Sequence, residues 1–150
     1  MPTIVIAPAD PAEAVELIRE LDAYQASLYP AESNHLLPLE SLRQANVTFL
    51  VARVEGAIAG CGAFVRHADY AEIKRMFVSP QYRGLKLGRR LLEEIEARIQ
   101  AHGLALARLE TGIAQPEALG LYASAGYVRR GPFGDYQEDP LSVFMEKRFA

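Results

Sequence analysis

The stretch Met76–Glu93 combines an apolar segment, a basic turn with glycines and a run of helical spacing. Between Ile73 and Leu92 there are six basic residues and no acidic one, although the whole chain has a formal net charge of -3. Pro80 ends the apolar segment, and leucines and isoleucines then recur on one helical face. Because the first amides of a helix have no intrahelical partner and its dipole favours negative charge there, this pattern predicts a phosphate-binding turn. An ordinary capped amphipathic helix with a solvated basic end is the alternative.

Two common phosphate-binding motifs can be tested against this turn. A Walker loop needs Gly-Lys followed by Ser or Thr, whereas Gly88 is followed by two arginines. A dinucleotide-binding turn needs three spaced glycines, and this turn offers Gly84 and Gly88 alone. The residues of this turn therefore exclude a Walker loop and argue against a dinucleotide-binding turn.

The segment that starts at Val78, Val-Ser-Pro-Gln-Tyr-Arg-Gly-Leu-Lys-Leu-Gly-Arg-Arg-Leu-Leu, resembles the acyl-CoA-binding motif of the GCN5-related N-acetyltransferases (GNAT), written Gln/Arg-x-x-Gly-x-Gly/Ala. Gln81, Arg83 and Gly84 fit the motif, whereas Lys86 stands where the family usually has glycine or alanine. The resemblance implies that the loop amides hold the pyrophosphate of acetyl-CoA. It assigns cofactor contacts to Met76, Phe77, Val78, Arg83, Gly84, Leu85, Lys86, Leu87, Gly88, Arg89, Gln115 and Tyr122.

Acyl transfer from a thioester to an amine needs a neutral amine, donors to the thioester carbonyl and a proton source for the thiolate. Glu72 lies six residues before Val78, where many members of the family place a general-base glutamate. By the same resemblance, the Val78 amide would face the thioester carbonyl, Tyr122 would be the general acid and Gln115 would contact the pantetheine arm. From the residues alone, Glu72 can also be a solvated strand-end glutamate and Tyr122 a packed helix tyrosine.

Two expected loops carry polar and aromatic residues suited to binding an acceptor. One is expected from Tyr24 to Leu37, and the other is the Gly- and Pro-rich stretch Gly131–Pro140. Carboxylates in these loops, such as Asp135, would suit a cationic amine. An ordinary role as surface residues is equally open, and the spacing identifies no molecule beyond a small-molecule or peptide amine. The candidate substrate-binding residues are Tyr29, Glu32, Asn34, His35, Phe133 and Tyr136.

Composition indicates one soluble globular domain over residues 1–150, with 50% hydrophobic and 23% charged residues. The single cysteine, Cys61, excludes an internal disulfide framework and is expected in the core, and three scattered histidines offer no zinc-ligand spacing. The acidic balance argues against nucleic-acid binding, and the chain has no apolar run or signal-peptide pattern that would direct it to a membrane. A cytoplasmic protein is expected. The resemblance also implies a homodimer, because members of the family often pair through late strands.

The remaining pattern predicts the elements that position these residues. A helix capped by Asp10, a short helix at Leu39–Ala45, a long helix from Leu87 and a fourth at Pro116–Ala125 accompany the strands. Glu55-Gly56 is expected to form a hairpin turn, and the order of elements predicts an α+β fold with a mixed, mostly antiparallel central sheet and helices on both faces. The expected strands are Thr3–Ile6, Thr48–Val54, Ala57–Arg66, Glu72–Val78, Ala105–Thr111, Tyr127–Arg130 and Ser142–Arg148.

The sequence is compatible with two classes of function. The first is an acetyl-CoA-dependent N-acetyltransferase that works by direct transfer in a ternary complex. The second is a non-catalytic acyl-CoA-binding sensor of the same fold, with another kind of anion-binding regulator as a weaker option. The presence of both Glu72 and Tyr122 favours the enzyme, because a binding module needs neither group.

Overall fold

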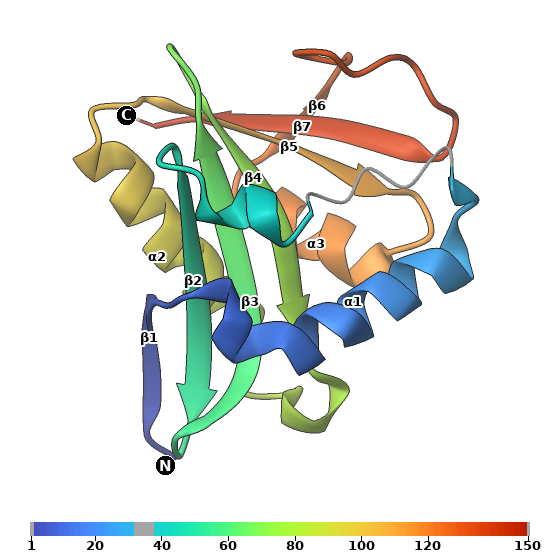
Figure 1. The fold of residues 1–150 in the computed structure, drawn as a ribbon. Coiled ribbons are helices and arrows are strands. Elements are labelled where there is room, and N and C mark those ends of the chain that lie inside the picture. Colours follow the sequence, from blue (N-terminus) through green and yellow to red (C-terminus); the bar gives the residue numbers. More distant parts are fainter. Residues whose placement is uncertain (1, 32–37, 150) are drawn as a thin grey trace.

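The computed structural model describes residues 2–31 and 38–149. They form one seven-stranded sheet (Figure 1). Its strands are β1 (Ile4–Pro8), β2 (Val47–Val54), β3 (Ala57–Arg66), β4 (Ala71–Val78), β5 (Leu106–Gly112), β6 (Val128–Arg130) and β7 (Ser142–Arg148). They lie in the order β1-β2-β3-β4-β5-β7-β6. Every neighbouring pair is antiparallel except β4 and β5, which confirms the predicted mixed sheet.

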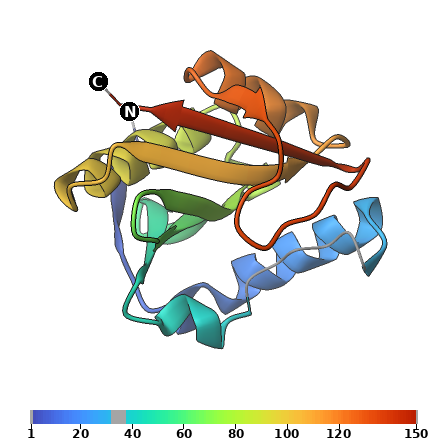
Figure 2. The same cartoon turned by 90° about the horizontal axis from the view of Figure 1, so that it is seen from above.

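Helices cover both faces of this sheet, as predicted. Helix α1 (Val15–Leu28) lies on one face, and α2 (Leu87–Ala101) and α3 (Pro116–Ser124) lie on the other (Figure 2). Buried residues of α1 pack with those of β2 and β3, whereas α2 and α3 share a larger core with β4, β5 and β7. Among the described residues, no helix is long and apolar enough to cross a membrane. Short 3₁₀ turns occur at η1 (Pro11–Ala14), η3 (Glu40–Arg43) and η4 (Pro80–Tyr82).

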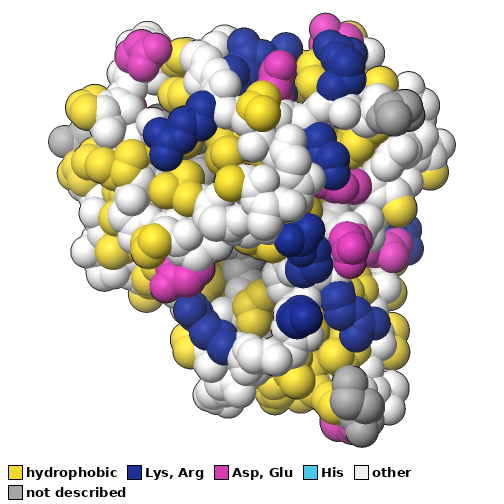
Figure 3. Space-filling model, turned by 180° about the vertical axis from the view of Figure 1, so that it is seen from behind, with side chains coloured by type: hydrophobic (Ala, Val, Ile, Leu, Met, Phe, Trp, Pro, Cys, Tyr) yellow, Lys and Arg dark blue, Asp and Glu magenta, His cyan; other side chains and the backbone are white. Residues whose placement is uncertain are grey.

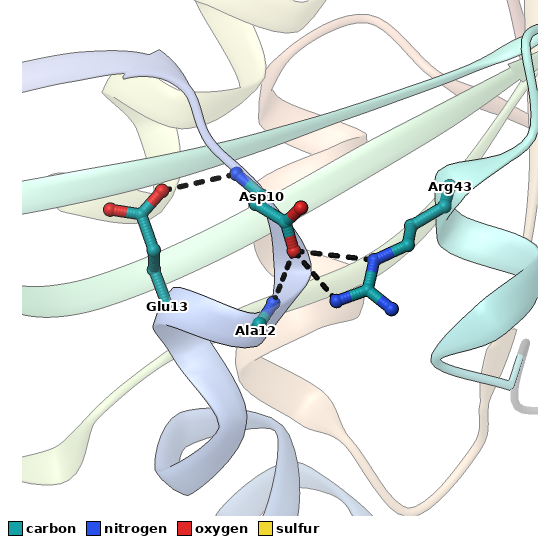
Figure 4. Close-up of polar contacts among 4 residues, drawn as sticks. All are labelled: Asp10, Ala12, Glu13 and Arg43. Atoms are coloured by element: carbon teal, nitrogen blue, oxygen red, sulfur yellow. Dashed lines mark hydrogen bonds and ion pairs between the residues drawn. The ribbon is translucent and has the colours of Figure 1, made fainter.

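Asp10 begins the first helical segment through a capping box (Figure 4). Its Oδ1 accepts a hydrogen bond of 2.8 Å from the Ala12 amide, and its own amide donates to Glu13 Oε2 at 3.2 Å. Arg43 Nη2 donates to the same Oδ1 at 2.9 Å. The Ala12 bond and then the Arg43 bond hold the pKa of Asp10 below its usual value. The predicted cap is therefore confirmed, and it sets the direction in which α1 leaves β1.

Two predictions for this part of the chain are wrong. The loop expected from Tyr24 begins too early, because α1 continues to Leu28. Tyr24 lies within the helix and packs against β4, where its ring lies 6.3 Å from that of Phe77. The helix expected at Leu39–Ala45 is only the 3₁₀ turn Glu40–Arg43. For Tyr24, packing against the sheet outweighs the local sequence pattern that suggested a loop.

The parallel pairing of β4 with β5 runs from Ala71 to Ile73 and leaves the last part of β4 outside it. At Arg75 the backbone is left-handed, with φ 61°, and the register of β4 against β3 shifts nearby. Such a bulge redirects a strand. The end of β4 therefore turns away from β5 and opens a gap between the two strands.

Glycines of β3 let α2 approach this part of the sheet closely. A β-carbon on Gly62 would lie 2.7 Å from Met76 Sδ and 2.9 Å from Ile95 Cδ1, so a side chain there would force these two side chains to move. Cys61 between the two β3 glycines is fully buried, as expected of a core residue. The close packing at Gly60 and Gly62 places the start of α2 beside the end of β4.

Candidate active site

A cavity of about 790 Å³, here called the main cleft, lies between the end of β4 and the starts of α2 and α3. It contains all but one of the residues predicted to contact a cofactor. The exception is Leu85, which packs in the small core beside β1 and β3. The predicted residues that line the cleft are Met76, Phe77, Val78, Arg83, Gly84, Lys86, Leu87, Gly88, Arg89, Gln115 and Tyr122.

The turn before α2 leaves main-chain donors available to a ligand. The first helical hydrogen bond runs from the Arg90 amide to the Lys86 carbonyl at 3.1 Å, so the amides of the preceding residues have no partner in the helix. Gly84 and Lys86 both have left-handed backbones, with φ of 92° and 59°. Lys and Arg side chains surround a hollow on this face of the molecule (Figure 3). The arrangement suits an extended, multiply charged anion.

Tyr122 lies on α3 and lines the main cleft. Its side chain is buried, and its ring packs edge-on against Tyr127 at 5.7 Å. Within residues 2–31 and 38–149 the Tyr122 hydroxyl has no hydrogen-bonding partner. Burial, followed by the nearby charge of Glu110, raises the pKa of Tyr122. The phenol therefore stays protonated and is available as a donor.

Glu72 lines a second cavity of about 670 Å³, here called the acidic cavity. It is 8% exposed, and its Oε2 accepts hydrogen bonds from Tyr136 Oη at 2.5 Å and from Lys74 Nζ at 3.4 Å. Glu72 is thus a nearly buried carboxylate with specific partners and not a solvated strand-end residue. The other residues of the cavity are His67, Tyr70, Phe133, Gly134, Asp135, Tyr136, Gln137, Glu138 and Asp139.

The candidate substrate-binding residues have different environments. Phe133 is 5% exposed and packs edge-on against Tyr136 at 5.2 Å, so both form an aromatic wall of the acidic cavity. Tyr29 is instead buried at the end of α1, where its hydroxyl donates to Gln115 in the main cleft. Neither cavity contains both Glu72 and Tyr122. Glu32, Asn34 and His35 lie outside the described residues.

Glu110 is a candidate that the sequence analysis missed. It lies on β5, and its Oε2 accepts a hydrogen bond of 2.7 Å from Ser142 Oγ. Its charge raises the pKa of Tyr122 in the main cleft and, after the larger effects of burial and Glu72, that of Tyr136 in the acidic cavity. Its carboxylate therefore acts electrostatically on both cavities. The sequence pattern that could have indicated Glu110 is the alternation of side chains along a strand, which places Arg108 and Glu110 on the same face of β5.

The main cleft and its anion-binding turn can be compared with known proteins. The family model described as "Acetyltransferase (GNAT) domain" matches residues 45–129. An IAA acetyltransferase of Azospirillum brasilense is 51% identical over 151 residues, which cover 98% of this chain and 99% of the relative. The chain belongs to the GNAT family of acetyltransferases.

Solved structures agree with this assignment. A Klebsiella pneumoniae protein named as an acyl-CoA N-acyltransferase is 40% identical, with a TM-score of 0.82 and coverage of 100% of this chain and 99% of that one. The PaiA N-acetyltransferase of Thermoplasma acidophilum, crystallised with coenzyme A, has a TM-score of 0.76 at 21% identity, over 98% and 99% of the two chains, which shows the common fold. This GNAT protein is an acetyl-CoA-dependent N-acetyltransferase. The predicted family, fold class, enzyme class and cosubstrate are confirmed.

Proposed function

We propose that this acetyltransferase transfers the acetyl group directly to a primary amine while both substrates are bound, with Glu72 as general base and Tyr122 as general acid. The main cleft binds acetyl-CoA, and the acidic cavity admits the amine. One observation carries the proposal: β4 contributes Glu72 to the acidic cavity and Met76–Val78 to the main cleft. The two substrates therefore approach each other along a single strand, from opposite ends.

The main cleft fits coenzyme A in size, charge and donors. Its volume of about 790 Å³ lies in the range of ligand-binding sites. Arg83, Lys86 and Arg89 line it beside the free amides at the start of α2, which supports binding of the phosphates there. The Val78 amide at the strand end is the donor that we assign to the thioester carbonyl, and Gln115 is the residue that we assign to the pantetheine arm.

The protein groups can move both protons of the reaction. Tyr136 and Lys74 hold the Glu72 carboxylate through Oε2, and within the described ranges Oε1 has no protein partner. Glu72 therefore takes a proton from the amine, directly or through a water, as the nitrogen bonds to the acetyl carbon. When the carbon–sulfur bond breaks, Tyr122 gives its hydroxyl proton to the leaving thiolate. The raised pKa of Tyr122 keeps that proton in place until then.

The charge of the acidic cavity supports an amine that carries a second positive group. Asp135, Glu138 and Asp139 line it, and the described lining residues include no Lys or Arg, whereas the charge of Glu72 is paired with that of Lys74. A small diamine or a basic peptide would be attracted to this cavity. The 51% identity to the IAA acetyltransferase makes IAA the second candidate acceptor.

The acceptor can be tested by measuring thiol release from acetyl-CoA with three compounds: 1,4-diaminobutane, butylamine and IAA. We expect kcat/KM to be about 10-fold or more higher for the diamine than for the monoamine, equivalent to roughly 1.4 kcal/mol. The variant Asp135→Asn should reduce that preference without changing the KM for acetyl-CoA. Equal rates with both amines would contradict the role of charge, and transfer to IAA alone would replace the amine by the second candidate.

Calorimetric binding of acetyl-CoA without transfer to any amine or peptide would show that the protein is a non-catalytic acyl-CoA-binding sensor. Formation of a homodimer stays a prediction, which light scattering on the purified protein would test.

A further inference from the structure

We propose that Tyr29 is a positioning residue for the arm of coenzyme A: it holds Gln115 so that the side-chain amide N–H groups of Gln115 face the main cleft. Tyr29 is at the end of α1, outside the cleft lining, and contacts the cosubstrate only through Gln115. The inference rests on the proposed binding of coenzyme A in the main cleft. It adds a residue from the opposite face of the sheet to the cosubstrate site.

The hydrogen bonds of Tyr29 determine which end of the Gln115 amide is free. The Ala114 amide lies 3.3 Å from Tyr29 Oη, and a main-chain N–H can only donate, so the hydroxyl oxygen accepts this bond. The single hydroxyl proton is then donated to Gln115 Oε1 at 3.0 Å. The amide oxygen is engaged, and Nε2 has no hydrogen-bonding partner among residues 2–31 and 38–149, so Nε2 and its two protons are left for a ligand. The arm of coenzyme A carries amide carbonyls, which accept such bonds.

Gly112 creates the space that Tyr29 occupies. A β-carbon at Gly112 would lie 1.7 Å from Tyr29 Oη and 2.1 Å from its Cζ, so any other residue would expel the ring. Tyr29 is 7% exposed, and burial raises its pKa, so the hydroxyl remains protonated. Gly112 ends β5, and the Gln115 amide donates to its carbonyl at 3.2 Å. One tyrosine therefore joins the end of α1, the end of β5 and the start of α3.

Space filling alone does not account for this hydroxyl. A phenylalanine would pack equally well against Gly112, but it would leave the Gln115 side chain free to rotate. An unrestrained glutamine must be ordered when a ligand binds, which weakens binding. The hydroxyl of Tyr29 therefore contributes to affinity for the arm of coenzyme A by ordering Gln115 in advance.

A double-mutant cycle read by calorimetry tests this role without relying on turnover. The variants are Tyr29→Phe, Gln115→Ala and the double variant, each titrated with coenzyme A and with adenosine 3′,5′-bisphosphate, which lacks the arm. We expect Tyr29→Phe to raise the Kd for coenzyme A by about 3- to 10-fold, as for the loss of one hydrogen bond. The same change made in Gln115→Ala should have no further effect, and the Kd for the bisphosphate should not change in any variant.

Tyr127→Phe is the matched control, because Tyr127 is a buried tyrosine whose hydroxyl donates to Glu96 at 2.8 Å, outside the cleft lining. It should lower Tm while leaving the Kd for coenzyme A unchanged. The positioning role would be overturned if Tyr29→Phe raised the Kd for coenzyme A by the same factor in the unaltered protein and in Gln115→Ala. It would also be overturned if Tyr29→Phe weakened the binding of coenzyme A and of the bisphosphate equally, or left the Kd for coenzyme A unchanged. If the unaltered protein failed to bind coenzyme A, the assignment of the cleft would fall as well. Normal binding without amine acetylation would contradict only the proposed function.

Discussion

Tyr136 donates its hydroxyl proton to Glu72 Oε2 across 2.5 Å, although the two residues are 64 positions apart in the chain. The loop between β6 and β7 thereby orients a carboxylate that belongs to β4. Burial and the charge of Glu72 raise the pKa of Tyr136, so this donor keeps its proton. Since Oε2 is engaged, we expect Oε1 to take the proton from the amine.

Replacement of Glu72 by glutamine should remove the general base while keeping a similar shape. We expect Glu72→Gln to lower kcat by roughly 10²–10⁴-fold, as is typical for loss of a general base. The KM for acetyl-CoA should remain close to its original value, because Glu72 does not line the main cleft. Steady-state kinetics over a range of pH would check this. A pH–rate profile identical to that of the unaltered enzyme would show that Glu72 is not the base.

Tyr122→Phe should slow transfer by about 10²-fold, the lower end of the range for general acid catalysis. The ring and its packing against Tyr127 are retained, so Tm should change little. Because the pKa of Tyr122 is raised above 10.0, its ionisation should not reduce kcat as pH approaches that value. Circular dichroism and thiol release measure the two effects separately. Full activity in the variant would remove Tyr122 from the mechanism.

Gly84→Asp should abolish binding of coenzyme A, because it places a carboxylate in the turn that we assign to the pyrophosphate. Gly56→Asp is the matched control. Both glycines have left-handed backbones, with φ of 92° and 85°, and a β-carbon at either position would meet no atom within 4 Å. The two variants should therefore lose similar stability, while only Gly84→Asp loses binding in a calorimetric titration. Equal affinity in the two proteins would contradict the site.

Lys86→Gly should distinguish the effect of the Lys86 backbone conformation on stability from the effect of its charge on binding. Lys86 has a left-handed backbone with φ 59°, which costs about 1–2 kcal/mol for an L-residue, partly offset by the entropy that glycine loses on folding. We expect the free energy of unfolding to rise by up to about 1 kcal/mol in urea denaturation. Affinity for coenzyme A should fall, and more so at low salt, because an ammonium is lost. Unchanged affinity at low salt would show that Lys86 contributes no charge to the site.

Alkaline pH should destabilise the protein through its buried tyrosines. Burial, with neighbouring acidic residues, raises the pKa of Tyr122, Tyr127 and Tyr136 above the ordinary 10.0. As pH rises past that value the unfolded chain releases these protons first, so the free energy of unfolding falls. Each group contributes at most about 1.4 kcal/mol per pH unit. Burial also raises the pKa of Cys61 from 9.0 to about 12, which extends the effect to lower pH.

Thermal denaturation between pH 8 and 11 would measure this dependence. Tyr127→Phe should show a shallower fall in Tm above pH 10 than the unaltered protein, because one of the shifted groups is missing. Parallel curves would show that Tyr127 ionises at the same pH in the folded and unfolded states.

The sequence by itself determined the features that depend on near neighbours. Asp10 caps its segment through residues two and three positions away. Glu55 and Gly56 adopt the left-handed backbones of a tight hairpin, and Gly126, with φ 99°, ends α3. These features depend on local hydrogen bonds and dihedral preferences, which a short stretch of chain specifies. The motif around Gly84, which indicated the family, is likewise contained in a short stretch of chain.

The tertiary structure decided which distant groups meet. Because β5 inserts between β4 and β7, residues from the second half of the chain reach Glu72 and Tyr29. Tyr24 of α1 packs against Phe77 of β4, and the side chain of Gln115 accepts a hydrogen bond from a tyrosine 86 residues earlier. No local pattern encodes such contacts, since they form only when the order of strands brings the elements together. The site is therefore a local motif placed in a setting that the whole sheet creates.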